Sequence, residues 1–318
     1  MRRRDFLSSA AAAAALLPTA ALAETFAPSP AGAPQSTAAD AHAMPLGLLI
    51  APAKAPEETI RRVHDLGLPT CFLSLDAYIG KFTPALATQF KGLLAKYNVT
   101  CTTVEVVGPP PLVWDFMQGP STIGLVPPDT RAARIDALKQ ASDFAKLLGV
   151  HQVQTHCGFI PENPGDPLYK ETVAAIRQVA EHCAANHQRF LMETGQETPT
   201  TMARAIRDVN LPNLGVGLDT ANLILYGKAN PVDAVAILGP RVHAVHAKDG
   251  RWPTNPDKLG EEVLIGTGLV DFAKVFAGLR KAGYTGAITI ERETNGPQQI
   301  EDVRKEKQYL EKVLAEVT

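Results

Sequence analysis

The chain has 318 residues, with 31 lysines and arginines, 33 aspartates and glutamates, and a formal net charge of −2. This balance lacks the basic excess that holds a nucleic-acid backbone, so nucleic acid is not expected as a partner. Residues 1–23 contain three arginines and one aspartate, so a chain that begins at residue 24 carries a charge of −4.

The first 23 residues have the pattern of an export signal. Three consecutive arginines precede Phe6-Leu7, a run rich in alanine and leucine follows, and Ala21-Leu22-Ala23 fits a small-residue cleavage site. The pattern predicts a twin-arginine signal peptide, recognition by the twin-arginine export machinery and a periplasmic location. A retained membrane anchor is the weaker alternative, because the apolar run is too short to span a bilayer. Residues 24–43, rich in alanine and proline, are predicted to be a flexible linker, and residues 44–318 a single catalytic domain.

Short apolar runs alternate with helical patterns through residues 45–317. The apolar runs predict strands at residues 45–50, 70–76, 99–107, 150–156, 190–193, 214–219, 242–248 and 287–291. The 3.6-residue patterns predict helices at residues 56–66, 84–97, 129–148, 169–187, 200–209, 231–238, 270–282 and 299–317. A proline-rich stretch, residues 108–128, is long for a plain connection and is predicted to form a lid or rim.

Eight such alternations predict parallel strands joined by crossover helices, and eight parallel strands close into a barrel. The predicted fold class is therefore α/β, with a single (β/α)8 TIM barrel. A doubly wound open sheet is the runner-up, but no GxGxxG sequence follows the first strand. The four cysteines are predicted to be buried free thiols, with disulfides as the alternative, because they lack CxxC spacing and three lie in apolar runs.

Four consecutive predicted strands carry a polar side chain at their C-terminal end. These residues are Glu193 in FLMETG, Asp219 in VGLDTAN, His246 in VHAVHAKDG and Glu291 in AITIERE. Each shares strand parity with a small or apolar residue before it, so each is expected to point into the barrel. Barrel enzymes keep their active sites at this end, so the four side chains are expected to meet at one point.

Three carboxylates at one point would repel one another and raise their pKa values unless a cation lay between them. A divalent metal ion removes this conflict. Three carboxylates and one imidazole form a hard, mixed set of ligands, which favours Mn²⁺ first, then Co²⁺ or Mg²⁺, with Zn²⁺ also open.

The order of these four residues resembles the xylose-isomerase-like barrel superfamily and is most similar to its sugar phosphate isomerase/epimerase family. The similarity covers residues 44–318 and includes GTGLVDF at residues 266–272, which resembles the family's Gly-x-Gly-x-Val-Asp-Phe segment. The resemblance implies that Glu193, Asp219, His246 and Glu291 bind one divalent ion. It also implies that the two glutamates exchange a proton at the carbon next to a carbonyl, through an enediolate held on the metal. Such a step needs a base and a fixed positive charge beside the developing oxyanion.

Two positions depart from the pattern of the ketose epimerases in this family. Many of these enzymes have a histidine three residues after the sixth-strand aspartate, where this chain has Asn222. Asparagine can hydrogen-bond a sugar hydroxyl but cannot carry a proton. The family also tends to place an arginine a few residues beyond the seventh-strand histidine. Arg251 and Trp252 lie in that region here, but neither aligns cleanly with the family's arginine. We expect these three residues to bind substrate.

Four further residues are candidates for the site. His156, at the end of the fourth strand, is a candidate acid or base, with a structural bond to a backbone carbonyl as the alternative. Lys248 is a candidate for stabilising an enolate or an anionic group, with an ion pair to Asp249 as the alternative. Trp114 and Phe159 lie in loops at the expected mouth, where an aromatic face stacks on a sugar or simply anchors the loop.

The leading hypothesis is metal-dependent proton transfer next to a carbonyl on a non-phosphorylated carbohydrate, as in a sugar isomerase or epimerase. Sugar phosphates are chiefly cytoplasmic, so an exported enzyme meets free sugars, glycosides or their oxidised forms. The main alternative is a lyase or hydratase that acts on 3-keto sugars or 3-keto-glycosides with the same metal and base. A barrel endonuclease and a non-catalytic periplasmic carbohydrate-binding protein are the remaining alternatives. The oligomeric state stays open, and a homo-oligomer is compatible with an outer ring of helices.

Overall fold

The protein is described by a computed structural model that covers residues 44–53 and 55–317. Eight parallel strands form a closed barrel in the order β1-β10-β7-β6-β5-β4-β3-β2, which confirms the predicted fold class. The strands are β1 (Leu46–Ile50), β2 (Thr70–Ser74), β3 (Thr100–Glu105), β4 (Gln152–His156), β5 (Arg189–Glu193), β6 (Leu214–Asp219), β7 (Val242–Ala247) and β10 (Ile288–Ile290). The export signal and linker predicted for residues 1–43 lie outside the described residues.

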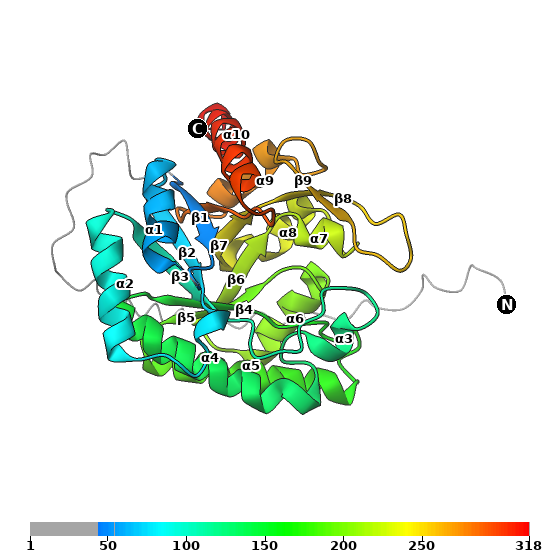
Figure 1. Cartoon of the computed structure of the whole chain (residues 1–318). Helices are drawn as coiled ribbons and strands as arrows, with labels where there is room; N and C mark the ends of the chain where they lie inside the picture. The colour runs from blue at the N-terminus through cyan, green and yellow to red at the C-terminus, as the bar shows by residue number, and fades with distance from the viewer. Residues whose placement is uncertain (1–43, 54, 318) are drawn as a thin grey trace, which may run out of the picture. The chain divides into compact units, whose positions relative to one another are not determined.

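The helices surround the strands, as Figure 1 shows. Those that connect and follow the barrel strands are α1 (Pro56–Asp65), α2 (Pro84–Lys96), α4 (Pro128–Leu148), α5 (Pro167–Ala185), α6 (Pro199–Val209), α8 (Pro231–Leu238), α9 (Phe272–Lys281) and α10 (Pro297–Glu316). All but α9 begin with a proline. The fixed φ of proline suits the first helical position, where a backbone N–H would have no acceptor within the helix. The sequence therefore marks where most of these helices begin.

The hydrophobic core has two layers. The larger layer lies between strands and helices, and a small cluster of Phe72, Leu191 and Ala244, with Leu49 packed against it, forms the other. Leu191 and Ala244 share strand parity with Glu193 and His246, so all four side chains point into the barrel, as predicted. Gly217 on β6 faces Gln154 so closely that a Cβ there would lie 1.9 Å from its Oε1 atom.

Short elements extend the C-terminal ends of several strands. A 3-10 turn (η2, Asp76–Tyr78) follows β2, α3 (Gly119–Thr122) lies in the long excursion after β3, and α7 (Asn222–Leu225) follows β6. An antiparallel hairpin, β8 (Asp249–Arg251) and β9 (Glu261–Val263), follows β7. Another 3-10 turn (η3, Gly239–Arg241) connects α8 to β7 at the opposite end. The excursion after β3 is therefore a rim element, as predicted.

Cys71, Cys157 and Cys183 are buried and Cys101 is half-buried, and all four are free thiols, as predicted. Among residues 44–53 and 55–317, no helix combines the length and apolar character needed to cross a bilayer.

Candidate metal centre

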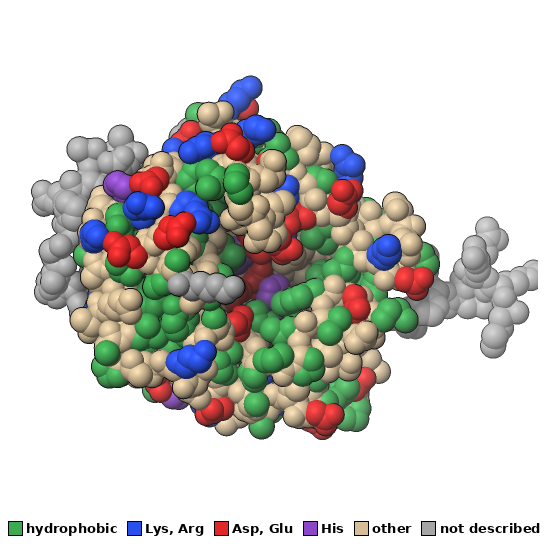
Figure 2. Space-filling model, viewed as in Figure 1, with side chains coloured by type: hydrophobic (Ala, Val, Ile, Leu, Met, Phe, Trp, Pro, Cys, Tyr) green, Lys and Arg blue, Asp and Glu red, His purple; other side chains and the backbone are tan. Residues whose placement is uncertain are grey.

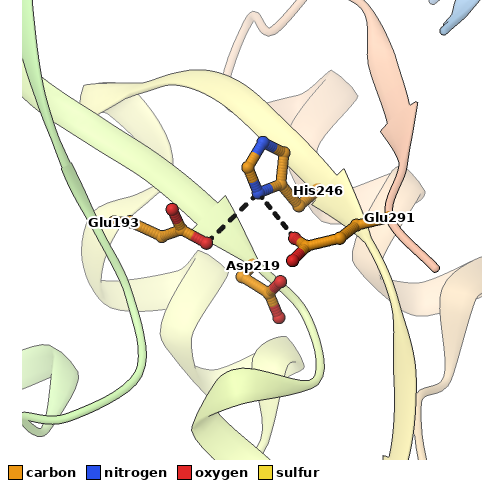
Figure 3. A group of neighbouring side chains, drawn as sticks. All are labelled: Glu193, Asp219, His246 and Glu291. Atoms are coloured by element: carbon orange, nitrogen blue, oxygen red, sulfur yellow. Dashed lines mark hydrogen bonds and ion pairs between the residues drawn. The ribbon is translucent and has the colours of Figure 1, made fainter. Parts of the chain in front are cut away.

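Four side chains from neighbouring strand ends surround one point at the mouth of the barrel (Figure 3). Glu193 ends β5, Asp219 ends β6, His246 lies near the end of β7, and Glu291 directly follows β10. Each offers one ligand atom, and these atoms all lie within 4.8 Å of one another. The register brings them together, because Asp219 pairs with His246, and Thr289 on β10 pairs with the same histidine.

His246 lies between the two glutamates. Its Nδ1 atom is 3.2 Å from Oε1 of Glu193 and 2.9 Å from Oε2 of Glu291. The ring packs edge-on against Phe72, with the ring centres 4.5 Å apart. This contact comes from inside the barrel and fixes the ring with Nδ1 toward the carboxylates.

Asp219 has one oxygen committed to the backbone and one that is not. Its Oδ1 atom accepts from the N–H groups of Ala221 (2.7 Å) and Asn222 (2.6 Å), which open α7. Its Oδ2 atom is buried and has no hydrogen-bond partner among the described residues. A buried, unpaired carboxylate oxygen beside an imidazole and two more carboxylates fits a divalent cation, because such an ion satisfies oxygen and nitrogen ligands together.

Burial and charge act against each other in this cluster. Burial raises the pKa of Glu193, but His156 and His246 outweigh it and bring the pKa down to about 2. Burial likewise opposes the ionised form of Glu291, and Lys248 and His246 hold its pKa well below the usual range. Burial and the neighbouring glutamates raise the pKa of Asp219. Lys248 opposes this rise in the pKa of Asp219. A metal ion at this site would need His246 in its neutral form, so the ion would take over the positive charge of the imidazolium.

Glu193 is oriented from its other side by β4. Its Oε2 atom accepts from Nε2 of Gln154 (2.9 Å) and lies 3.2 Å from Nε2 of His156. The second ring nitrogen of His156, Nδ1, lies 3.3 Å from Oε1 of Gln196. Thus one glutamate oxygen faces the metal centre and the other faces β4, and the histidine bonds side chains rather than a backbone carbonyl.

Glu291 is held in a similar way by Lys248. The ammonium of Lys248 is 3.2 Å from Oε1 of Glu291 and 3.4 Å from Oδ1 of Asn222, and it also contacts Glu293 closely. The predicted alternative partner, Asp249, instead binds backbone N–H groups of the segment 250–270.

A cavity of about 350 Å³ opens above the metal centre. Figure 2 shows a hollow with acidic side chains and a histidine at its floor. Its lining residues are Leu49, Ser74, Asp76, Glu105, Val107, Leu112, Trp114, His156, Gln196, Asn222, Leu225, Tyr226, Leu259, Glu291 and Glu293. Trp114, from the excursion after β3, packs edge-on against His156 with ring centres 4.8 Å apart and is 43% exposed.

Three residues predicted to bind substrate lie outside this cavity lining. Arg251 is on the β8–β9 hairpin, with its charge directed to Glu261 at 4.0 Å. Trp252 is 48% exposed and packs near Gly227. Phe159 packs against Gly119 and Tyr226, which makes it an anchor of the rim.

The cavity also contains polar residues that the sequence prediction did not place there. Asp76, Glu105 and Gln196 all line it. Glu105 ends β3 and is buried, and its Oε1 atom has no hydrogen-bond partner within the part of the chain that the structure describes. Burial and then the charge of Glu193 raise its pKa well above the usual range. Asp76 carries the same signal as the three predicted carboxylate ligands, a carboxylate at the end of an apolar run, whereas Glu105 lies within the predicted strand 99–107.

The comparisons with known proteins agree with this fold. A family model described as xylose isomerase-like TIM barrel matches residues 60–313, so the chain belongs to that family and the predicted resemblance is confirmed. An uncharacterized protein of Methanocaldococcus jannaschii is 26% identical over 196 residues, which are 58% of this chain. The chain spans only 63% of the length of that relative.

Solved structures extend the similarity over most of the chain. A xylose isomerase domain protein from Planctomyces limnophilus is 32% identical, with a TM-score of 0.80 over 86% of this chain and 98% of its own. A xylose isomerase-like TIM barrel protein from Mycobacterium smegmatis in complex with magnesium is 18% identical, with a TM-score of 0.67 over 87% and 98% of the two chains. A D-psicose 3-epimerase in the presence of D-fructose is 18% identical, with a TM-score of 0.65 over 85% and 99%. At 18% identity, these two likenesses establish the shared fold.

Proposed function

We propose that the protein is a divalent-metal-dependent sugar isomerase or epimerase that transfers a proton at a carbon next to a carbonyl. The meeting of four strand-end ligands on the floor of a cavity carries this proposal. The fold is shared with structures of sugar epimerases, and one related structure contains magnesium. The hard ligands Glu193, Asp219, His246 and Glu291 suit Mn²⁺ first, then Co²⁺ or Mg²⁺, with Zn²⁺ also compatible.

The chemistry divides between the ion and the two glutamates. An ion held at this site supplies a fixed positive charge beside a carbonyl oxygen. Glu193 and Glu291 lie on either side of His246, and both have lowered pKa values, so both are ionised at neutral pH. Either one can accept a proton from the substrate carbon and return that same proton to the enediolate of the substrate. Return on the opposite face requires the other glutamate to be protonated when the substrate binds, so that the two groups exchange roles in each turnover. His156 and Lys248 orient the two carboxylates and keep them ionised.

The cavity lining favours an uncharged carbohydrate. Its lining includes the carboxyl side chains of Glu291 and Glu293, and among the described residues neither lysine nor arginine lines it. Asn222 and Gln196 offer amide groups to hydroxyls, and Trp114 offers an exposed aromatic face. We further propose export to the periplasm through the twin-arginine machinery, on the pattern of residues 1–23.

A second candidate is a lyase or hydratase for 3-keto-glycosides. Leu112, Trp114 and Leu259 line the cavity, and apolar side chains of this kind suit a substituent carried by the sugar. The same metal ion and base would remove the acidic proton, after which a neighbouring group leaves or water adds.

Elemental analysis of the purified protein tests the metal. We expect one Mn, Co, Mg or Zn per chain, and a loss of affinity of about 100-fold or more in a Glu193→Gln/Glu291→Gln variant. Glu261→Gln, which removes an exposed carboxylate 4.0 Å from Arg251, serves as a control and should keep the ion. A wild-type protein that stays metal-free when divalent ions are supplied would contradict the proposal.

Incubation with ketoses and 3-keto-glycosides in deuterated water tests the reaction. An isomerase or epimerase incorporates deuterium next to the carbonyl of a free sugar. Turnover of 3-keto-glycosides alone, with loss of the aglycone or gain of water, would contradict the isomerase or epimerase proposal and support a lyase or hydratase. A metal-loaded protein that binds sugars without isotope exchange would indicate a binding protein.

A further inference from the structure

Lys248 is a fully buried cation that has no donor left for a ligand. Its side chain is 2% exposed, and its ammonium contacts Glu291, Asn222 and Glu293. A lysine ammonium has three N–H donors, so these three acceptors use all of them. Glu291 and Asn222 belong to the site floor, where Glu291 also faces His246.

Glu293 differs from the other two acceptors because it comes from the rim. Its side chain is 61% exposed, and it lines the cavity, whereas Lys248 does not. Its backbone N–H donates to Oε1 of Glu262 on β9 (3.2 Å), so its main chain is tied to the hairpin. The Glu293 carboxylate therefore separates the ammonium from the cavity.

This arrangement sets the charge that a ligand meets. Glu291 and Glu293 present carboxylates to the cavity, while the ammonium of Lys248, the residue between β7 and β8, is behind them. A substrate that carries a phosphate or carboxylate would have to displace Glu293 from Lys248 and would still face Glu291. Selectivity is often set in this way, by placing a like charge against the unwanted ligand.

We propose that Glu293 is a specificity-determining residue that covers Lys248 and thereby excludes anionic sugars, such as sugar phosphates and sugar acids, from the cavity. This inference rests on the proposed function for the claim that the excluded molecules are sugars. The covering of Lys248 by Glu293 does not depend on it. Removing the Glu293 carboxylate leaves one buried N–H donor of Lys248 without an acceptor and opens it to an anion.

Calorimetric titration with inorganic sulfate, at constant ionic strength and with the metal-loaded protein, tests this inference. We expect Glu293→Ala to bind sulfate at least about ten-fold more tightly than the wild type. The double variant Glu293→Ala/Lys248→Met should lose the gain, because the cation is gone. Glu261→Gln, which removes a carboxylate from the β8–β9 hairpin without touching Lys248, should bind sulfate like the wild type. Sulfate that binds directly to the metal ion would contribute equally to the titration of every variant, so the difference between variants excludes it.

Two results would overturn the inference. One is an unchanged sulfate affinity in Glu293→Ala, with a melting temperature that shows the variant is folded. The other is a gain that persists in the double variant, which would place the anion away from Lys248. Neither measurement requires turnover, so the sulfate titration can be interpreted even if no sugar substrate is found. The elemental analysis tests the proposed function separately.

Discussion

Glu306 on α10 is a buried carboxylate with incomplete pairing. Its Oε1 atom accepts from the N–H of Ile265 (3.2 Å), Arg292 lies 3.8 Å away, and Oε2 has no hydrogen-bond partner among the described residues. Burial raises its pKa from 4.5 to about 7, although the Ile265 N–H and Arg292 oppose the shift. The folded protein therefore binds a proton here more tightly than the unfolded chain does.

The sign of the resulting pH dependence follows from that difference. Between about pH 4.5 and pH 7 the folded state holds more protons, so the free energy of unfolding falls as the pH rises. We expect Glu306→Gln to match the wild type near pH 5 and to be more stable by about 2 kcal/mol at pH 8. Urea denaturation at the two pH values measures the difference. An equal effect of the substitution at both would show that Glu306 does not titrate in this window.

Asp249, the first residue of β8, is a second buried carboxylate, and both of its oxygens accept hydrogen bonds. Its Oδ1 accepts from the N–H groups of Gly250 (2.8 Å) and Val270 (3.1 Å), and its Oδ2 from Gly266 (3.0 Å) and Gly268 (2.8 Å). We expect Asp249→Ala to lower the free energy of unfolding by about 3–5 kcal/mol, because buried donors lose their acceptor. Asp249→Asn, which keeps one acceptor oxygen, should cost clearly less in the same urea titration. Equal losses in the two variants would contradict this role.

The sequence predicted that the four candidate ligands meet, and they do, because strand parity fixes the direction in which each side chain points. Glu193, Asp219 and His246 lie at strand ends with fixed facing, and Glu291 directly follows β10. Side chains in loops have no such period, so Arg251 and Trp252 were placed at the substrate although they lie outside the cavity lining. The alternative predicted for Lys248, an ion pair with Asp249, was wrong, because Glu293 approaches the ammonium from the segment after β10.

The excursion after β3 is fixed to the barrel by Arg134 on α4. This arginine is fully buried and donates to the backbone oxygens of Gly124 (2.8 Å), Pro111 (2.8 Å) and Thr122 (2.5 Å). A guanidinium is suited to this because it has five donors in a rigid plane. The segment that carries Trp114 is therefore a fixed wall of the cavity.

We expect Arg134→Met to loosen this wall and expose Trp114 more fully. The chain has two tryptophans, so the experiment uses a Trp252→Phe background in which Trp114 emits alone. The emission should shift to longer wavelength in Arg134→Met and less in Arg134→Lys, which keeps a charge and some donors. An emission unchanged by Arg134→Met, in a protein that still melts cooperatively, would show that other contacts hold the wall.

Among the elements, periodicity predicted the barrel strands and the helices around them, usually within three residues. The β8–β9 hairpin was missed, because strands of three residues are too short to show alternation. The short helices α3 and α7 escaped for the same reason, since a single turn has no apolar face. These elements line or support the rim of the cavity, so the sequence predicted the four clustered side chains better than the cavity walls.

For the whole molecule, an ion that binds only the folded state adds to stability. With free Mn²⁺ at 100 times its dissociation constant, we expect the free energy of unfolding to rise by about 2.7 kcal/mol and the melting temperature by about 5 °C. Asp219→Asn, which replaces the unpaired Oδ2 carboxylate oxygen, should lose most of this shift. The measurement is thermal unfolding with and without a chelator. A shift of the same size in both proteins would place the ion elsewhere.

The closure of the barrel joins segments that are distant in the chain. β1 pairs only with β2 and β10, and Leu46 lies opposite Ile288. Glu291 follows β10 directly, so the fourth ligand is synthesised after all the other barrel strands. While the ribosome is still making residues 250–290, the nascent chain has neither a closed sheet nor a full set of ligands. The four candidate ligands therefore meet only after translation has passed this point, and a chain that ends before it lacks both Glu291 and the strand that closes the barrel.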